Sequence, residues 1–220
     1  TQATLDAAAD EIRRATGAEV VTVQADITTE EGRAKLVAAC PDADILVNNN
    51  AGPAPGKFQD WGRDQYLEAF ESNMLAPVLM IRALLPGMRA RKFGRILNIT
   101  SFVVKELYPN MSLSNSLRVA ITGAMGSLAR ECAADGVTVN GILPGLMDTG
   151  ALRRVFADRA KRTGESEAAI RASMAESVPM KRLGTAEDFG GLCAFLASRH
   201  AGYITGQNIC VDGGLTKSVI

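Results

Sequence analysis

The sequence lacks residues that several common classes of functional site need. One histidine, His200, occurs in 220 residues, which excludes metal sites built on several histidines and any serine–histidine or cysteine–histidine pair without it. Its surroundings, SRHAGYITG, favour a surface loop. The formal net charge is zero, so no overall field attracts nucleic acid or an anionic membrane. No run approaches the roughly 20 apolar residues of a membrane span, and no basic-then-apolar leader opens the chain. We therefore expect neither nucleic acid nor a membrane as a partner.

The cysteines are few and form no CxxC pair. Cys40, Cys132, Cys193 and Cys210 are widely spaced, which is typical of free thiols in a reducing compartment and not of a disulfide framework. We expect a cytoplasmic protein. Apolar residues make up 47% and charged residues 22% of the chain, a globular composition. Residues 1–220 are expected to form a single domain.

Helical and strand-like patterns alternate along the chain. Helices are predicted at 4–16, closed by Gly17, and at 30–39, 66–85, 113–128 and 185–196, with two polar helices between Gly150 and Ser177. Strands are predicted at 18–26, 45–47, 94–101, 137–145 and 203–214. The helix from 66 is expected to end near Pro86 and allows a kink at Pro77. Strands that alternate with crossover helices predict an α/β fold, a doubly wound parallel sheet of Rossmann type in three αβα layers.

Five segments then carry a resemblance to a known family. They are NNAG ending at Gly52, Asn73 within AFESNMLAP, NITS ending at Ser101, VNGILPG with Pro144 and Gly145, and ITGQNICVDGG. In order and spacing they resemble the signature segments of short-chain dehydrogenases/reductases, in the branch similar to 3-oxoacyl-carrier-protein reductases. The resemblance implies an oxidoreductase that transfers hydride between NAD or NADP and a small carbonyl or alcohol substrate. It also implies a homotetramer or homodimer, assembled through the helices at 66–85 and 113–130.

Part of the resemblance concerns the adenosine end of the cofactor. Asp26 and Ile27 resemble the pair that contacts the adenine ring, although Asp26 could instead cap the next helix. Asn50, Ala51 and Gly52 resemble the segment whose backbone passes close to the ribose, although Gly52 could simply form a turn.

A second part concerns the nicotinamide end. Pro144, Gly145, Met147 and Thr149 resemble the loop that holds the nicotinamide carboxamide, with Leu146 adding an apolar contact. The later VDGG segment is expected to form a structural turn outside the active site.

The catalytic positions depart from the family pattern. Ser101 matches the family serine, and Asn73 resembles the helix residue that serves the proton relay. The tyrosine position holds Ser114 and the lysine position holds Arg118. An aliphatic hydroxyl is far less acidic than a phenol, whose ordinary pKa is near ~10, so Ser114 cannot replace the tyrosine, whereas Arg118 can still supply positive charge. Tyr108 is a substitute donor or, alternatively, a loop aromatic that packs locally.

The amino-terminal part also departs from the family. No glycine-rich G-x-x-x-G-x-G loop occurs upstream of the NNAG segment, so the first strand–helix–strand unit of the family is missing. The strand at 18–26 would then have no neighbour on the sheet. We therefore hypothesise that the natural protein is longer. We also expect no metal site.

Three functions remain open. The first is the oxidoreductase, with an unidentified proton donor such as water. The alternative is a catalytically impaired nucleotide-binding or oligomeric scaffold. The third is a non-redox reaction on an anionic substrate anchored by Arg118.

Overall fold

A parallel four-stranded sheet forms the centre of the protein. The computed structural model describes residues 1–218. Among these residues the strands are β1 (Ile45–Asn48), β2 (Gly94–Ile99), β3 (Val137–Pro144) and β4 (Asn208–Val211), in the spatial order β1-β2-β3-β4. All carboxyl ends therefore lie at one edge of the sheet, where the loops of such folds bind ligands.

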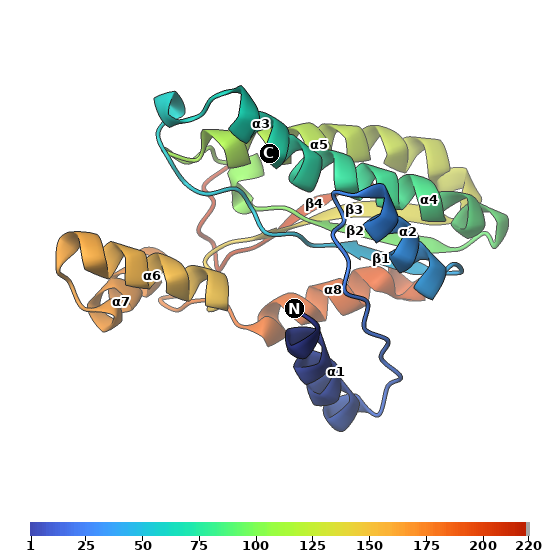
Figure 1. The fold of residues 1–220 in the computed structure, drawn as a ribbon, viewed down its shortest axis with the longest axis horizontal. Helices are drawn as coiled ribbons and strands as arrows, with labels where there is room; N and C mark the ends of the chain where they lie inside the picture. The colour runs from blue at the N-terminus through green and yellow to red at the C-terminus, as the bar shows by residue number, and fades with distance from the viewer. Residues whose placement is uncertain (219–220) are drawn as a thin grey trace.

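Helices cover both faces of this sheet, as Figure 1 shows. Helices α4 (Ala76–Ala90) and α5 (Ser112–Cys132) lie on one face, and α8 (Ala186–Ala197) lies on the other. Successive side chains of β2 alternate between the layers: Ile96 belongs to the α4 and α5 core and Leu97 to the α8 core, as strand geometry requires. The predicted three-layer α/β fold is confirmed.

The remaining elements surround this frame. The other α-helices are α1 (Gln2–Thr16), α2 (Glu30–Ala39), α3 (Arg63–Phe70), α6 (Gly150–Thr163) and α7 (Glu167–Ser177), and short 3₁₀ helices span Phe58–Asp60, Phe102–Val104, Ala133–Asp135 and Arg199–Ala201. Helices α6 and α7 pack on each other around buried Phe156, Ile170 and Leu183. No helix within residues 1–218 has the length and apolar character needed to cross a membrane.

The long helix expected at 66–85 differs from the prediction. Helix α3 passes through a π-helical turn, Glu71–Leu75, into α4, which continues to Ala90 and does not end near Pro86. Pro77 lies in the first turn of α4, directly after the π-helical turn. Met88, beyond Pro86, is completely buried, so tertiary packing stabilises the turn that the proline weakens.

The strand expected at 18–26 does not form. The segment pairs with no strand among the described residues, and a β-strand needs a neighbour to satisfy its backbone groups. Strand β1, with β2 as its single partner, is correspondingly open, and its Ile45 and Val47 are 46% and 49% exposed. The prediction was wrong because β-branched composition favours a strand but cannot supply its partner.

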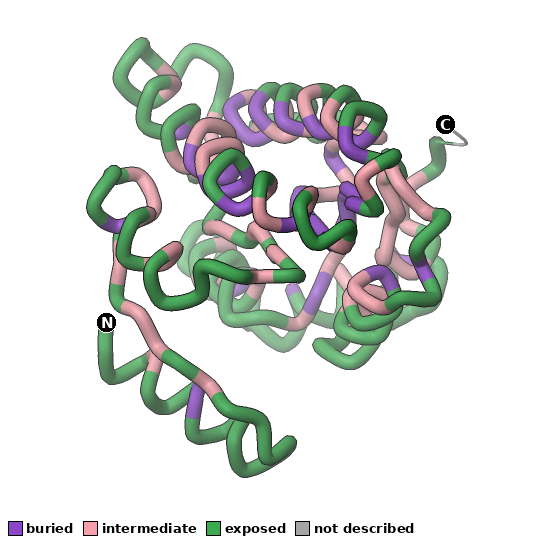
Figure 2. Tube along the Cα trace, turned by 90° about the vertical axis from the view of Figure 1, so that its right-hand side faces the viewer, coloured by how far each residue is buried: buried purple, intermediate pink, exposed green. Residues whose placement is uncertain are grey.

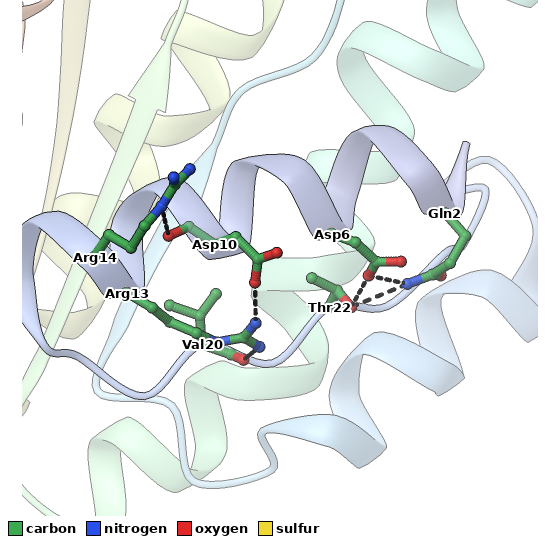
Figure 3. Close-up of polar contacts among 7 residues, drawn as sticks. All are labelled: Gln2, Asp6, Asp10, Arg13, Arg14, Val20 and Thr22. Carbon is green, nitrogen blue, oxygen red and sulfur yellow. Dashed lines mark hydrogen bonds and ion pairs between the residues drawn. The ribbon is translucent and has the colours of Figure 1, made fainter.

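Polar contacts with α1 take the place of the missing sheet bonds. The Gln2 amide donates to the Thr22 hydroxyl at 3.0 Å, the Thr22 hydroxyl donates to Asp6 at 3.2 Å, and Arg13 donates to the carbonyl of Val20 (Figure 3). Figure 2 shows α1 almost wholly exposed, and Ala9 is its one buried residue. The predicted end at Gly17 is confirmed, since this glycine caps the helix at φ 70°.

Candidate active site

A cavity of about 720 Å³ opens at the carboxyl end of β1. Two segments distant in sequence line it: Asp26 and Ile27 from one loop, and Asn50, Ala51 and Gly52 from the loop after β1. All five residues that the sequence assigned to the adenosine end of a cofactor therefore share one cavity.

Asp26 shapes its own loop and keeps an oxygen free. Its Oδ1 accepts hydrogen bonds from the Thr28 backbone N–H at 2.9 Å and from the Thr28 hydroxyl at 2.7 Å, and these bonds hold the pKa of Asp26 below its usual range. Thr29, and not Asp26, is the residue that caps α2. Among the described residues no donor is bonded to Asp26 Oδ2, so the ionised carboxylate can accept a ligand N–H.

The loop after β1 passes close to Arg118. A Cβ atom added to Gly52 would lie 2.8 Å from Arg118 Nη2, so the absence of a side chain allows this approach. The Asn50 amide donates to the Ser72 carbonyl at 3.0 Å and fixes the loop to the π-helical turn. Sequence reasoning missed the opposite wall of the cavity, which α3 and its flanks supply through Trp61, Gln65, Glu68 and Ser72.

Arg118 joins the tyrosine and lysine positions to the end of β2. Its Nε donates to Ser114 Oγ at 3.1 Å, and its Nη1 donates to the carbonyls of Thr100 and Ile99. Ser114 is only 4% exposed. Burial lowers the pKa of Arg118, and no carboxylate in the described part of the chain forms an ion pair with it.

A second, much smaller cavity of about 20 Å³ lies beside this arginine. Six of its nine lining residues are polar, and the full set is Asn48, Asn50, Asn73, Pro77, Asn98, Ile99, Thr100, Arg118 and Ile121. Asn48 and Asn98 occupy paired positions on β1 and β2, and the Asn48 amide donates to Asn98 Oδ1 at 2.9 Å. The sequence had predicted Asn50, Asn73 and Arg118 as site residues but had missed Asn48 and Asn98, although polar residues at the ends of two apolar strands were a usable signal.

Of the two other predicted catalytic residues, Asn73 lines both cavities, whereas Ser101 lines neither and directly follows Thr100. Ser101 Oγ accepts from the Val103 N–H at 3.4 Å and caps the short helix after β2. Asn73 lies in the π-helical turn and lines both cavities; its amide donates to Ser72 Oγ at 2.8 Å. Tyr108 is 53% exposed and packs edge-on against Phe102, with ring centroids 5.7 Å apart.

The predicted nicotinamide loop makes structural contacts of its own. Pro144 ends β3, the Gly145 N–H donates to the Val211 carbonyl at 3.0 Å, and Thr149 caps α6. Met147 lines a separate cavity of about 350 Å³. The structure therefore does not bring Met147 into the cavity that holds Asp26 and Gly52.

The VDGG turn has the structural role predicted for it. Gly213 and Gly214 have φ angles of 63° and 85°, which a side chain would disfavour. Asp212 Oδ1 accepts from the Gly214 N–H at 3.0 Å and closes the turn. Within residues 1–218, no group of three or more histidine, cysteine, aspartate or glutamate residues is placed to hold a metal ion.

Comparison with known proteins decides the family. A family model described as enoyl-(acyl carrier protein) reductase matches residues 1–216. The NADPH-dependent reductase BacG of Bacillus subtilis is 32% identical over 206 residues, which cover 92% of this chain and 80% of BacG. The chain belongs to the short-chain dehydrogenase/reductase family. The class predicted from the sequence, an NAD(P)-dependent oxidoreductase, is confirmed with it.

Two further relatives place the chain within the family. The 3-oxoacyl-[acyl-carrier-protein] reductase FabG of Haemophilus influenzae is 34% identical over 177 residues, covering 80% of this chain and 69% of FabG. A solved, NADPH-bound short-chain oxidoreductase from Pseudomonas aeruginosa PAO1, described as containing an atypical catalytic center, superposes with a TM-score of 0.86. It is 29% identical, and the match covers 98% of this chain and 84% of that one.

The described residues fit one part of a nicotinamide dinucleotide. The small residues Ala51, Gly52 and Ala54 line the same cavity as Asp26, which suits a flat base and its ribose. No glycine-rich loop for the pyrophosphate is present among them. The fit therefore rests on the adenosine end.

Proposed function

We propose that this short-chain oxidoreductase reduces a carbonyl compound with NADPH, at a site formed by Ser101, Ser114, Arg118 and Asn73. The observation that carries the proposal is the placement of Arg118, which bonds Ser114 and the carbonyl of Thr100, the residue before Ser101. One buried cation at the family's lysine position thus bonds the tyrosine position and the residue next to the family serine. BacG is named as an NADPH-dependent reductase, which supports NADPH as the cofactor.

Asp26, Ile27, Asn50, Ala51 and Gly52 would hold the adenosine end of the cofactor. Pro144, Gly145, Met147 and Thr149 stay as the proposed contacts of its nicotinamide end. When bound, the cofactor supplies a hydride to the carbonyl carbon.

Residues of the proposed site then stabilise negative charge on the substrate, and none of them carries a phenol. Ser114 Oγ accepts a hydrogen bond from Arg118 and is only 4% exposed, so its proposed role is to orient the guanidinium toward the substrate oxygen. The guanidinium stays protonated at neutral pH and stabilises negative charge that develops on that oxygen. None of these four residues has the acidity of the family tyrosine, and Tyr108 is exposed and packs on Phe102. We therefore assign the proton to water.

The first test is binding and turnover with the same preparation. Calorimetry measures NADPH binding, with NADH as the comparison, and absorbance follows NADPH oxidation with ketones that include 3-oxoacyl thioesters. Binding with oxidation supports the proposal. Binding without oxidation of any ketone supports the scaffold alternative, and turnover of an anionic substrate without an absorbance change supports the non-redox one.

Restoring the usual catalytic pair tests whether the pocket is intact. The double variant Ser114→Tyr with Arg118→Lys should raise the rate of NADPH oxidation, since a phenol donates a proton far better than water does. A double variant that folds, binds NADPH and reduces no faster would contradict the proposed geometry.

We also propose a homo-oligomer, a tetramer or dimer built through α4 and α5. An apolar groove of about 480 Å³ lies between these helices, lined by Val78, Ile81, Arg82, Leu85, Pro86, Arg89, Met125 and Leu128. Residues 1–220 are proposed to act as one domain. The cytoplasm stays the proposed compartment because all four cysteines are free thiols.

A further inference from the structure

The backbone conformation of Gly52 does not require a glycine. Six described glycines have a positive φ angle, the region that only glycine adopts readily, and Gly52 is not one of them. Apart from its chain neighbours, a Cβ built on Gly52 would meet only two described atoms within 4 Å: Arg118 Nη2 at 2.8 Å and Arg118 Cζ at 3.8 Å. A side chain at this position is therefore excluded by one group, the guanidinium of Arg118.

This guanidinium has little freedom to move aside. Its Nε donates to Ser114 Oγ at 3.1 Å, and its Nη1 donates to the carbonyls of Thr100 and Ile99. The group is planar and rigid, so a shift of Nη2 away from Gly52 also displaces Nε and Nη1. A methyl group at Gly52 would therefore break hydrogen bonds of a partly buried cation.

The loop that carries Gly52 is fixed as well. The Asn50 amide donates to the Ser72 carbonyl at 3.0 Å, and Asn50 Oδ1 accepts from the Ala51 N–H at 2.9 Å. These bonds tie the loop to the π-helical turn two residues before Gly52. Because both sides of the contact are held, an added Cβ can be accommodated only by the loss of hydrogen bonds.

The contact leaves one nitrogen of Arg118 available. Nη2 donates to no group in the described part of the chain, and it is not among the enclosed polar atoms without a partner there. Its two N–H groups can therefore donate to a ligand.

We propose that Gly52 is a positioning residue for Arg118. Because Gly52 has no side chain, Nε and Nη1 keep their partners while Nη2 stays free to bind a ligand. The role depends on arginine, since a lysine at position 118 has no Nη2. The contact itself needs neither cofactor nor substrate, whereas its effect on turnover rests on the reduction proposed above.

A double-mutant cycle on thermal unfolding tests the contact. Gly52→Ala should lower Tm by about 2–10 °C, the shift expected when an added methyl group overpacks a held contact in a chain of this size. In the Arg118→Lys background the same substitution should lower Tm little or not at all. Arg118→Met also lacks Nη2 and gives a second background. Gly190→Ala on α8, with open space around its Cβ, is the control that should lose no stability.

Steady-state kinetics with NADPH measures the effect on the reaction. Gly52→Ala should lower kcat by up to about 100-fold, the cost of a slightly misplaced catalytic group, and much less in the Arg118→Lys background. Equal losses of Tm in both backgrounds would overturn the proposal, because the methyl group would then clash with something other than Arg118. An unchanged Tm in Gly52→Ala, or an unchanged kcat despite a lower Tm, would overturn it as well. If the parent chain oxidises no NADPH, the proposed reduction fails, and the Tm cycle alone decides the contact.

Discussion

At the scale of single residues, Arg118 makes different contacts from the lysine that the family pattern places at this position. An ammonium group makes point contacts, whereas a guanidinium donates along a fixed plane. Here that plane contacts Ser114 through Nε and the carbonyls of Ile99 and Thr100 through Nη1. The arginine is therefore held rigidly at the end of β2, with one nitrogen turned toward Gly52.

Removing this charge should impair catalysis more than folding. We expect Arg118→Met to lower kcat/KM for ketone reduction by about 100-fold, the lower range for loss of one group that stabilises a developing oxyanion. Steady-state NADPH oxidation measures the effect, and far-UV circular dichroism verifies the fold. Arg130→Met, an exposed position of α5, should be unchanged. Equal activity of both variants would remove Arg118 from the site.

Gly32 connects helix α2 to the proposed adenosine pocket. A Cβ at this position would lie 1.9 Å from the Asp26 carbonyl oxygen, so Gly32→Ala must displace the backbone of the loop. We expect a loss of about 1–3 kcal/mol in the free energy of unfolding and weaker NADPH binding in calorimetry. Gly191→Ala, with open space around its Cβ on α8, should instead gain about 0.5–1 kcal/mol. Normal NADPH affinity in Gly32→Ala would contradict the placement of the pocket.

At the scale of elements, the start of α8 shows how a local motif sets pH sensitivity. Thr185 and Asp188 form a capping box in which each side chain accepts from the other residue's backbone N–H. Arg182 also donates to Asp188, and this bond is the main reason that the pKa of the carboxyl lies well below its usual range. The pairing therefore favours the ionised carboxylate in the folded state.

The sign of the pH effect follows from this depressed pKa. The stabilisation is present above the ordinary aspartate pKa of about 3.9 and is lost as the pH falls through the lower pKa of the folded state. Asp188→Asn should therefore lower Tm at neutral pH, and the difference from the parent chain should shrink in strong acid. Asp158→Asn, which removes an exposed pair with Arg162, should have a smaller effect. A pH-independent difference for Asp188→Asn would reject the linkage.

The unpaired segment at 18–26 leads to a prediction about amide hydrogen exchange. Its backbone groups lack sheet partners, whereas those of β2 are bonded to β1 and β3. Hydrogen exchange should therefore be fast for the amides of Val20 to Gln24 and slow for those of Ile96 and Leu97. Comparable protection of the two segments would show that the first one pairs in solution.

At the scale of the whole molecule, the proposed oligomer forms through the face of α4 and α5. Leu128→Glu places a charge in the apolar groove, so it should dissociate the oligomer by leaving that charge without water or a partner. Light scattering after size-exclusion chromatography measures the mass. Val155→Glu, at an exposed position of α6, should leave the mass unchanged. An oligomer of unchanged mass in Leu128→Glu would place the interface elsewhere.

Local patterns predicted most of the elements, because helical periodicity and β-branched runs act within a few residues. Helix α2 and strand β1 agree with their predicted ranges almost to the residue. The strand at 18–26 and the helix end at Pro86 were wrong for one reason: pairing partners and core packing lie elsewhere in the chain.

The same distinction between local pattern and tertiary structure applies to the candidate site. The sequence by itself determined the α/β class, the family resemblance, and the substitutions Ser114 and Arg118, since each is a matter of residue identity and order. Only the tertiary structure showed that Asn98 and Thr100 line a small cavity with Arg118, and that Met147 lines a different cavity from Asp26. Hydrogen-bond satisfaction and shared cavities depend on which strand ends and helices meet in space, and no local pattern encodes that meeting.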